Sequence, residues 1–129
     1  MTTAPEPVDP FDLPEALGTH DVTWRADDGL AGHRVRGCLE PDGGAAVACD
    51  LLAVDEAFPA PVADDATRLL AHQAWRHGQV HLVSYDGRLT LLVPGRCFSA
   101  ELVLESVARL AKALGASAKR YRVLLRLGR

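Results

Sequence analysis

Residues 79–115 read QVHLVSYDGRLTLLVPGRCFSAELVLESVARLAKALG. The dipeptide Asp86-Gly87 separates two apolar-rich runs, and Asp-Gly in this position is typical of a tight β-hairpin. Farther along, Ser99 is suited to cap the start of a helix and Gly115 to end it. The apolar positions between them recur at helical spacing, at Val103, Val107, Leu110 and Leu114. The stretch therefore predicts a hairpin over residues 79–94 and an amphipathic helix from Ser99 to Gly115.

The segments on either side of this stretch predict one more helix and two strands. Upstream, an extended run at residues 46–54 precedes a helix that Asp64 or Asp65 can cap and that runs to about His77. Downstream, residues 120–127 alternate apolar side chains with mostly basic ones, as in a half-buried strand. The order in the second half of the chain is thus strand, helix, hairpin, helix, strand.

The first half predicts a small antiparallel sheet. Residues 21–25, 33–39 and 46–54 are extended in character and are separated by turns rich in Asp and Gly, which favours a meander of three strands. Apolar and polar residues alternate only imperfectly in the third strand, and this indicates burial on both of its faces. Residues 12–17 predict one short helical turn. Residues 1–10 contain three prolines and predict a disordered tail, which leaves residues 11–129 as a single α+β domain.

These elements predict a largely antiparallel sheet with two long helices on one face. Two architectures fit. From residue 45 onward the order matches the split βαβ unit of ferredoxin-like folds, with the first hairpin extending or covering the sheet. Alternatively, the order helix, three strands, helix, hairpin, helix over about residues 11–115, with Asp86-Gly-Arg-Leu-Thr-Leu-Leu-Val before a long helix, resembles the class I type III secretion chaperones. That resemblance implies a bacterial chaperone-like protein, and the strand after residue 118 departs from the family pattern.

Composition narrows the class of protein. The chain has 129 residues, 48% hydrophobic and 24% charged, which is typical of a globular domain. It has no apolar run of about 20 residues and no basic and apolar blocks at its start, so we expect a cytoplasmic protein without membrane contact. Residues 1–65 carry 14 acidic and 3 basic side chains, whereas residues 88–129 carry 2 acidic and 9 basic ones. This polarity favours packing of one half on the other, or an anionic partner.

Cysteine and histidine give no metal or catalytic pattern. Three cysteines without a C-x-x-C pair predict neither a disulfide framework nor a zinc ribbon. Cys97 lies beside Arg96 near a helix start, but no sequence feature supplies the base that a nucleophilic cysteine needs. His72, His77 and His81 do not share one helix face, so we expect no metal and no cofactor.

Asp50 is a charged residue inside an apolar run. Asp50 and Asp55 are five residues apart on an extended segment, so they point to opposite faces and do not form a catalytic pair. We expect Asp50 to form a buried ion pair with an arginine, such as one from the last strand. The chain also lacks the short motifs of nucleotide-binding proteins and of common hydrolases.

The basic row of the last strand is the predicted partner-binding site. Arg120, Arg122 and Arg126 align on one face, and Leu124 and Trp24 are candidate apolar anchors. The predicted strands lack the aromatic motif with which some sheets bind RNA, and this argues against nucleic-acid binding. The predicted function is a non-catalytic adaptor or chaperone-like accessory that binds a protein or peptide and forms homodimers.

The functional prediction has two further parts, an expectation for the outer sheet face and an alternative function. Val83 and Leu92 are expected on the outer sheet face, where they need cover from the N-terminal hairpin or a second chain. The alternative function is a small dimeric ferredoxin-like enzyme, or a small-molecule-binding protein, that uses His81, Tyr85 or Cys97.

Overall fold

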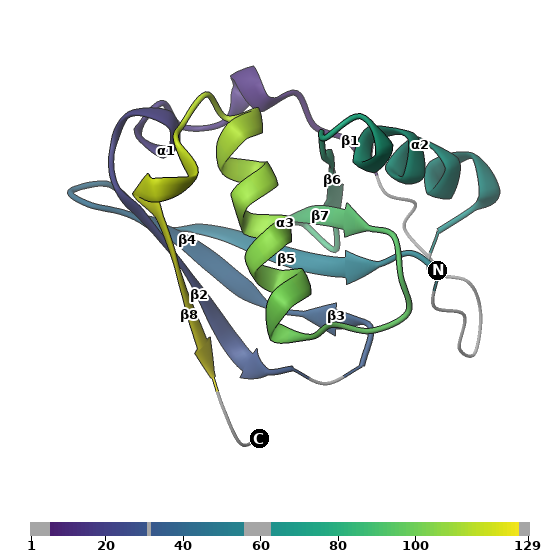
Figure 1. Cartoon of the computed structure of the whole chain (residues 1–129). Helices are drawn as coiled ribbons and strands as arrows, with labels where there is room; N and C mark the ends of the chain where they lie inside the picture. The colour runs from purple at the N-terminus through teal and green to yellow at the C-terminus, as the bar shows by residue number, and fades with distance from the viewer. Residues whose placement is uncertain (1–5, 31, 56–62, 127–129) are drawn as a thin grey trace.

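The structure, a computed structural model, describes residues 6–30, 32–55 and 63–126 (Figure 1). Within this part of the chain, no helix is both long and apolar enough to span a membrane. The elements, in chain order, are β1 (Glu6–Pro7), η1 (Pro10–Asp12), α1 (Ala16–Thr19), β2 (Val22–Gly29), β3 (Arg34–Val35), β4 (Gly37–Pro41), β5 (Val47–Ala53), α2 (Asp65–Arg76), β6 (His81–Tyr85), β7 (Arg88–Val93), α3 (Ala100–Ala113), η2 (Ala118–Arg120) and β8 (Tyr121–Arg126).

The strands form one open sheet in the order β1-β6-β7-β5-β4-β2-β8, and β3 also pairs with β5. The predicted meander is confirmed, because β2, β4 and β5 pair antiparallel in sequence. The predicted hairpin is β6 and β7, where Asp86 and Gly87 have φ values of 55° and 72°. Such positive values at both central residues are those of a tight two-residue turn.

The place of β8 in the sheet argues against the predicted ferredoxin-like architecture. β5 pairs with β7, and β8 pairs with β2 at the far edge of the sheet. β4 and β2 therefore lie between β5 and β8, so β5 to β8 do not form the contiguous four-stranded sheet of a ferredoxin-like unit. The order α1, three strands, α2, hairpin, α3 is present as the sequence predicts, and β8 is added after it.

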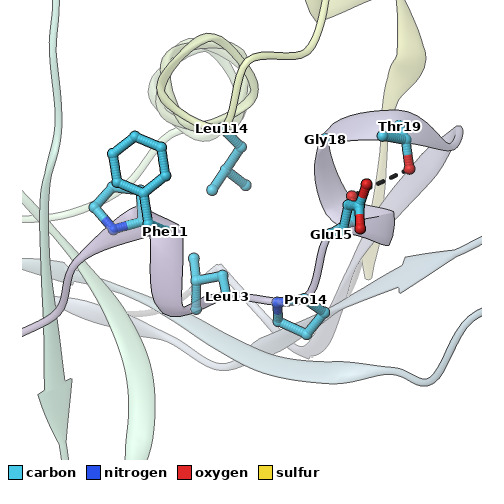
Figure 2. Close-up of a pocket in the computed structure, with 8 residues that line it drawn as sticks. Phe11, Leu13, Pro14, Glu15, Gly18, Thr19 and Leu114 are labelled. Carbon is cyan, nitrogen blue, oxygen red and sulfur yellow. Dashed lines mark hydrogen bonds between the residues drawn. The ribbon is translucent and has the colours of Figure 1, made fainter.

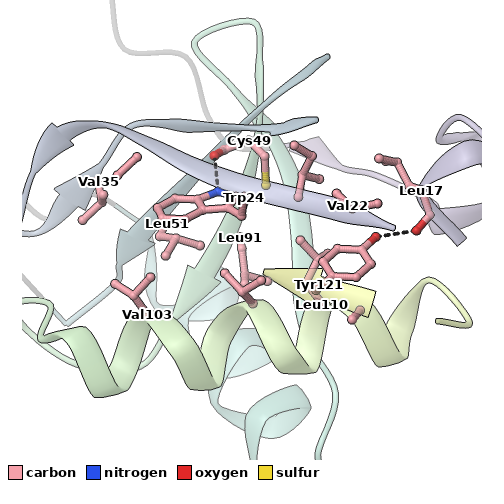
Figure 3. Close-up of a cluster of buried hydrophobic side chains, with 14 of the residues drawn as sticks. Leu17, Val22, Trp24, Val35, Cys49, Leu51, Leu91, Val103, Leu110 and Tyr121 are labelled. Carbon is pink, nitrogen blue, oxygen red and sulfur yellow. Dashed lines mark hydrogen bonds between the residues drawn. The ribbon is translucent and has the colours of Figure 1, made fainter. Parts of the chain in front are cut away.

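The main core lies between the sheet and α3 (Figure 3). Ser99 caps α3, as predicted, by accepting a hydrogen bond from the Leu102 amide at 3.2 Å. The buried stripe of α3 packs on side chains from β2, β5 and β7. Figure 3 shows Val103 and Leu110 on the side of α3 that faces Trp24, Leu51 and Leu91, and all five belong to one buried cluster.

The second long helix, α2, contacts the other face of the sheet. Ala71 of α2 clusters with Leu52, Val83 and Leu92, which alternate along their strands with residues of the main core. The prediction that both long helices cover one face is therefore confirmed for α3 and wrong for α2. β5 and β7 are central strands with apolar residues on both faces, and each face needs its own cover. Val83 and Leu92, predicted to need cover, are buried within the chain.

The start of the chain joins the sheet. Glu6 and Pro7 pair with β6, and the Val8 amide donates to the Leu82 carbonyl at 2.9 Å. The prediction of a disordered tail is thus wrong for residues 6–10, and its first five residues lie outside the described part. The single helical turn predicted at residues 12–17 is replaced by two short pieces, η1 and α1. These pieces position the groove described next.

Candidate partner-binding site

A shallow groove, lined by both apolar and polar groups, lies between the N-terminal segment and the C-terminal end of α3 (Figure 2). Its volume is about 390 Å³, and it is lined by Pro10, Phe11, Leu13, Pro14, Glu15, Gly18, Thr19 and Leu114. The Phe11 side chain is 95% exposed. Figure 2 shows Leu114 pointing from the end of α3 into the space between Phe11 and Glu15. The groove thus offers a large aromatic ring beside an apolar floor.

Hydrogen bonds across the fold hold the walls of this groove. The carboxylate of Asp9 caps η1 by accepting from the Phe11 amide at 3.0 Å. The Tyr121 hydroxyl donates to the Leu17 carbonyl at 2.5 Å, and the Arg120 guanidinium donates to the Thr19 carbonyl at 3.0 Å. Burial raises the pKa of Tyr121 to about 12, so the hydroxyl keeps its proton at neutral pH.

Glycine permits the close contact between α1 and α3. A Cβ at Gly18 would lie 2.6 Å from the Leu114 carbonyl oxygen, a distance that carbon and oxygen atoms do not reach without a shift. The last turn of α3 can therefore rest directly on α1. The contact between Gly18 and Leu114 therefore fixes one wall of the groove.

The groove continues around Phe11 toward the end of α2. A neighbouring hollow of about 320 Å³ is lined by Pro10, Phe11, Lys112, Ala113, Leu114 and Gly115. A third, of about 220 Å³, is lined by His77, Gly78, Gln79, Lys112 and Ala113. Successive hollows share lining residues, so they lie next to one another in an elongated row across the C-terminal ends of α3 and α2. An extended peptide could cross such a row of hollows.

The predicted basic strand supplies a second surface, the β8 face, which we define as Arg122 and Leu124. Arg122 is exposed and Leu124 is 56% exposed. A hollow of about 240 Å³ beside them is lined by Arg25, Ala26, Leu124 and Leu125. Arg126 belongs to the same strand, and its side chain lies outside the described part.

Two residues of the predicted site have other roles. Arg120 ends η2 ahead of the strand, and its guanidinium is bonded to α1. Trp24 is 0% exposed, and its indole nitrogen donates to the Cys49 carbonyl at 3.0 Å (Figure 3). The prediction of Trp24 as a surface anchor is therefore wrong. Val22, Trp24 and Ala26 share the face of β2 that packs under α3, so the tryptophan belongs to the core.

Asp50 is fully buried and binds two arginines. Arg88 donates from Nε and Nη2 to its two carboxylate oxygens at 2.9 and 3.0 Å, and Arg34 donates from Nη2 at 3.0 Å. The Gly37 amide donates to the same carboxylate at 3.2 Å. The hydrogen bond from Asp50 raises the pKa of Arg88. The predicted buried ion pair is confirmed, with its arginines on β3 and β7 and not on the last strand.

The remaining titratable candidates do not converge on one site. His72 lies 2.9 Å from a carboxylate oxygen of Asp55, whose other oxygen accepts from the Gly95 amide, so this pair ties α2 to the loop after β7. His77 is the C-cap of α2, and Cys97 is exposed. Among the described residues, no group of three His, Cys, Asp or Glu side chains is placed to hold a metal ion. The elongated groove is lined by none of His81, Tyr85 or Cys97.

His81 gives a pH-dependent contribution to stability. Burial lowers the pKa of His81 below its usual 6.5. As the pH falls below that value, the unfolded chain takes up a proton before the folded one does, so folding stability decreases. We expect wild-type protein to lose stability between about pH 7.5 and about pH 5, and His81→Gln to lose less. Urea denaturation across this range measures both slopes, and identical slopes would contradict the assignment.

Comparisons with known proteins add no relative: no family model, no curated protein and no solved structure matches this chain. The functional argument therefore depends on the geometry of this molecule. The groove around Phe11 is the part of the candidate site that the sequence prediction missed. The available signal was Asp9-Pro10, because Asp-Pro favours the start of a turn and would place the following Phe11 in an ordered segment.

Proposed function

We propose that this chain is a non-catalytic adaptor or chaperone-like accessory that binds a protein or peptide partner. The observation that carries the proposal is Phe11, a 95% exposed aromatic ring in a groove whose walls are held by contacts with residues distant in the sequence. Large apolar side chains in such positions are typical of interaction sites, where one or two aromatic anchors contribute most of the binding energy. The bound segment would place an apolar side chain against Phe11 and Leu114.

The element order supports a chaperone-like function. It is the order on which the resemblance to class I type III secretion chaperones rests, and the proposed setting is accordingly the bacterial cytoplasm. Leu69 and Leu70 of α2 are 57% and 48% exposed. We assign them to contact with a second copy, as part of the proposed homodimer. Arg122 and Leu124 remain in the proposed partner surface, and Arg120 contributes by positioning α1.

The test compares two exposed apolar residues on different elements. Tagged wild-type protein, Phe11→Ser and Leu104→Ser are each purified gently from the native host, and the intact complexes are weighed by native mass spectrometry. Leu104 lies on α3 and is 52% exposed. We expect a stoichiometric second protein with wild type and with Leu104→Ser, and a loss of at least about tenfold with Phe11→Ser. Folding is checked by urea denaturation, where exposed substitutions should change stability by less than about 0.5 kcal/mol.

Two results would contradict this function. Equal recovery of the partner with Phe11→Ser would remove the groove from the binding site. A homodimer that carries a small molecule and no second protein would favour the alternative, a small dimeric enzyme or small-molecule-binding protein. In that case, substitutions at His81, Tyr85 and Cys97 would be the next to test for loss of the bound molecule.

A further inference from the structure

The two edges of the sheet differ in how well they are protected. β1, at one edge, is two residues long and ends at Pro7, which cannot donate a backbone hydrogen bond. β8, at the other edge, has six residues without proline and pairs with β2. Among the described residues, no strand pairs with the outer edge of β8. Its outward N–H and C=O groups are therefore open to an added strand.

The side chains of β8 favour a particular kind of added strand. Tyr121, Val123 and Leu125 point toward the core, but only Tyr121 is buried, and the other two remain half-exposed at the edge. An added strand with apolar residues on that side would cover them. On the outer side, Arg122 is exposed, and within the described residues no acidic side chain pairs with it. Neighbouring Arg25, by contrast, is already paired with Glu40 and Asp27.

The charged side chains of β8 itself and of the segment that leads into it are of one sign. Lys119, Arg120 and Arg122 are exposed along this edge, and residues 106–126 contain no Asp or Glu. An acidic strand would therefore be attracted, and a basic one repelled.

A second copy of β8 is a poor occupant for the same reason. Antiparallel pairing of two β8 strands, with the apolar rows kept on one face, requires residues of equal parity to face each other. The central registers then place Arg122 opposite Arg122, Arg120 opposite Arg126, or Arg122 opposite Arg126. Like charges directly opposite each other destabilise a strand pair.

We propose that the outer edge of β8 binds an extended segment of a partner protein that alternates acidic and apolar residues, added to the sheet as a further strand. The acidic side chains face Arg122 on the outer side, and the apolar ones cover Val123 and Leu125. This inference rests on the proposed function in that the segment belongs to a protein partner. It names a surface separate from the Phe11 groove, so each can be tested without the other.

The probe is a fluorescein-labelled peptide of about eight residues that alternates Glu and Val. Its binding is measured by fluorescence anisotropy, beside a Lys-Val peptide and a peptide with the Glu and Val residues in two blocks. We expect the Glu-Val peptide to bind best, with an affinity that falls as salt is added. Hydrogen exchange should show new protection of amides in β8, because a bound strand pairs with its backbone.

Matched charge reversals locate the site. Arg122→Glu is expected to weaken Glu-Val binding by about tenfold or more and to strengthen Lys-Val binding, because attraction is exchanged for repulsion. Arg76→Glu reverses another exposed arginine, on α2, changes the net charge by the same amount and should bind like wild type. Phe11→Ser should also bind like wild type, even if the groove proposal fails.

Three outcomes would overturn the inference. Equal weakening by Arg122→Glu and Arg76→Glu would mean that net charge alone attracts the peptide. Loss of binding in Phe11→Ser would place the peptide in the groove. Protection of β8 amides that rises with protein concentration in the absence of peptide, together with a dimer in analytical ultracentrifugation, would mean that a second copy occupies this edge.

Discussion

Replacing Asp50 by Asn is expected to lower the free energy of unfolding by about 3 kcal/mol, because removal of one partner leaves buried charge without compensation. The Asp50 carboxylate is fully buried and receives hydrogen bonds from Arg34, Arg88 and the Gly37 amide. Asparagine has nearly the same size, so the change removes charge without making a cavity. Its amide group would also place a donor against donors from the arginines. Urea denaturation followed by tryptophan fluorescence measures the loss.

Asp86→Asn is the matched control. Asp86 also pairs with Arg34, at 3.0 Å, but its side chain is 52% exposed. Solvent screens such a pair, so we expect a change within about 0.5 kcal/mol. Comparable losses in the two variants would show that burial of Asp50 does not determine its contribution. An unchanged stability of Asp50→Asn would mean that the arginines find water when their partner is removed.

Local chemistry made much of the fold predictable. The turn at Asp86-Gly87 needs positive φ values that few residue pairs adopt, and the cap at Ser99 depends on an amide three residues away. Asp64 caps α2 in the same way, through the Thr67 amide. Each signal is contained within one or two turns of chain. The element order therefore followed from the sequence with boundaries that differ by a few residues.

Long-range pairing was not predictable in the same way. Nothing within residues 120–127 specifies that β8 joins β2, about 100 residues earlier, because any open edge can accept a strand. The side of the sheet covered by α2 likewise depends on which face of β5 is left open by α3. It was easier to predict which residues of β2 face the core, since Val22, Trp24 and Ala26 alternate with polar residues. That alternation indicates a buried Trp24.

The Phe11 groove was not predictable from local sequence either. Its walls depend on bonds from Arg120 and Tyr121 to residues 101 and 104 positions earlier in the chain. Residues 1–10 contain three prolines among mostly small or polar residues, which is typical of a tail. The ordered conformation of this segment comes from tertiary contacts. Sites built in this way are found from the folded molecule and seldom from a motif.

Replacing Trp24 by Ala is expected to lower the free energy of unfolding by about 3 to 5 kcal/mol, as for other buried tryptophans. The ring is 0% exposed, packs in the core under α3, and donates a hydrogen bond to the Cys49 carbonyl. Truncation leaves a cavity and an unpaired carbonyl oxygen in the interior. Thermal or urea unfolding followed by circular dichroism measures the effect without relying on tryptophan fluorescence.

The variant Leu124→Ala is the counterpart of Trp24→Ala, because the sequence predicted both residues to be apolar anchors for a partner. Leu124 lies on the exposed face of β8, so its truncation should change stability by less than about 0.5 kcal/mol. It should weaken partner binding, whereas Trp24→Ala should reduce binding only in proportion to the fraction of unfolded protein. The reverse pattern, a stable Trp24→Ala that fails to bind and a destabilised Leu124→Ala, would mean that Trp24 of β2 faces solvent and Leu124 of β8 faces the core. Because alternate residues of a strand point to opposite faces, such a result would require both β2 and β8 to shift by one residue.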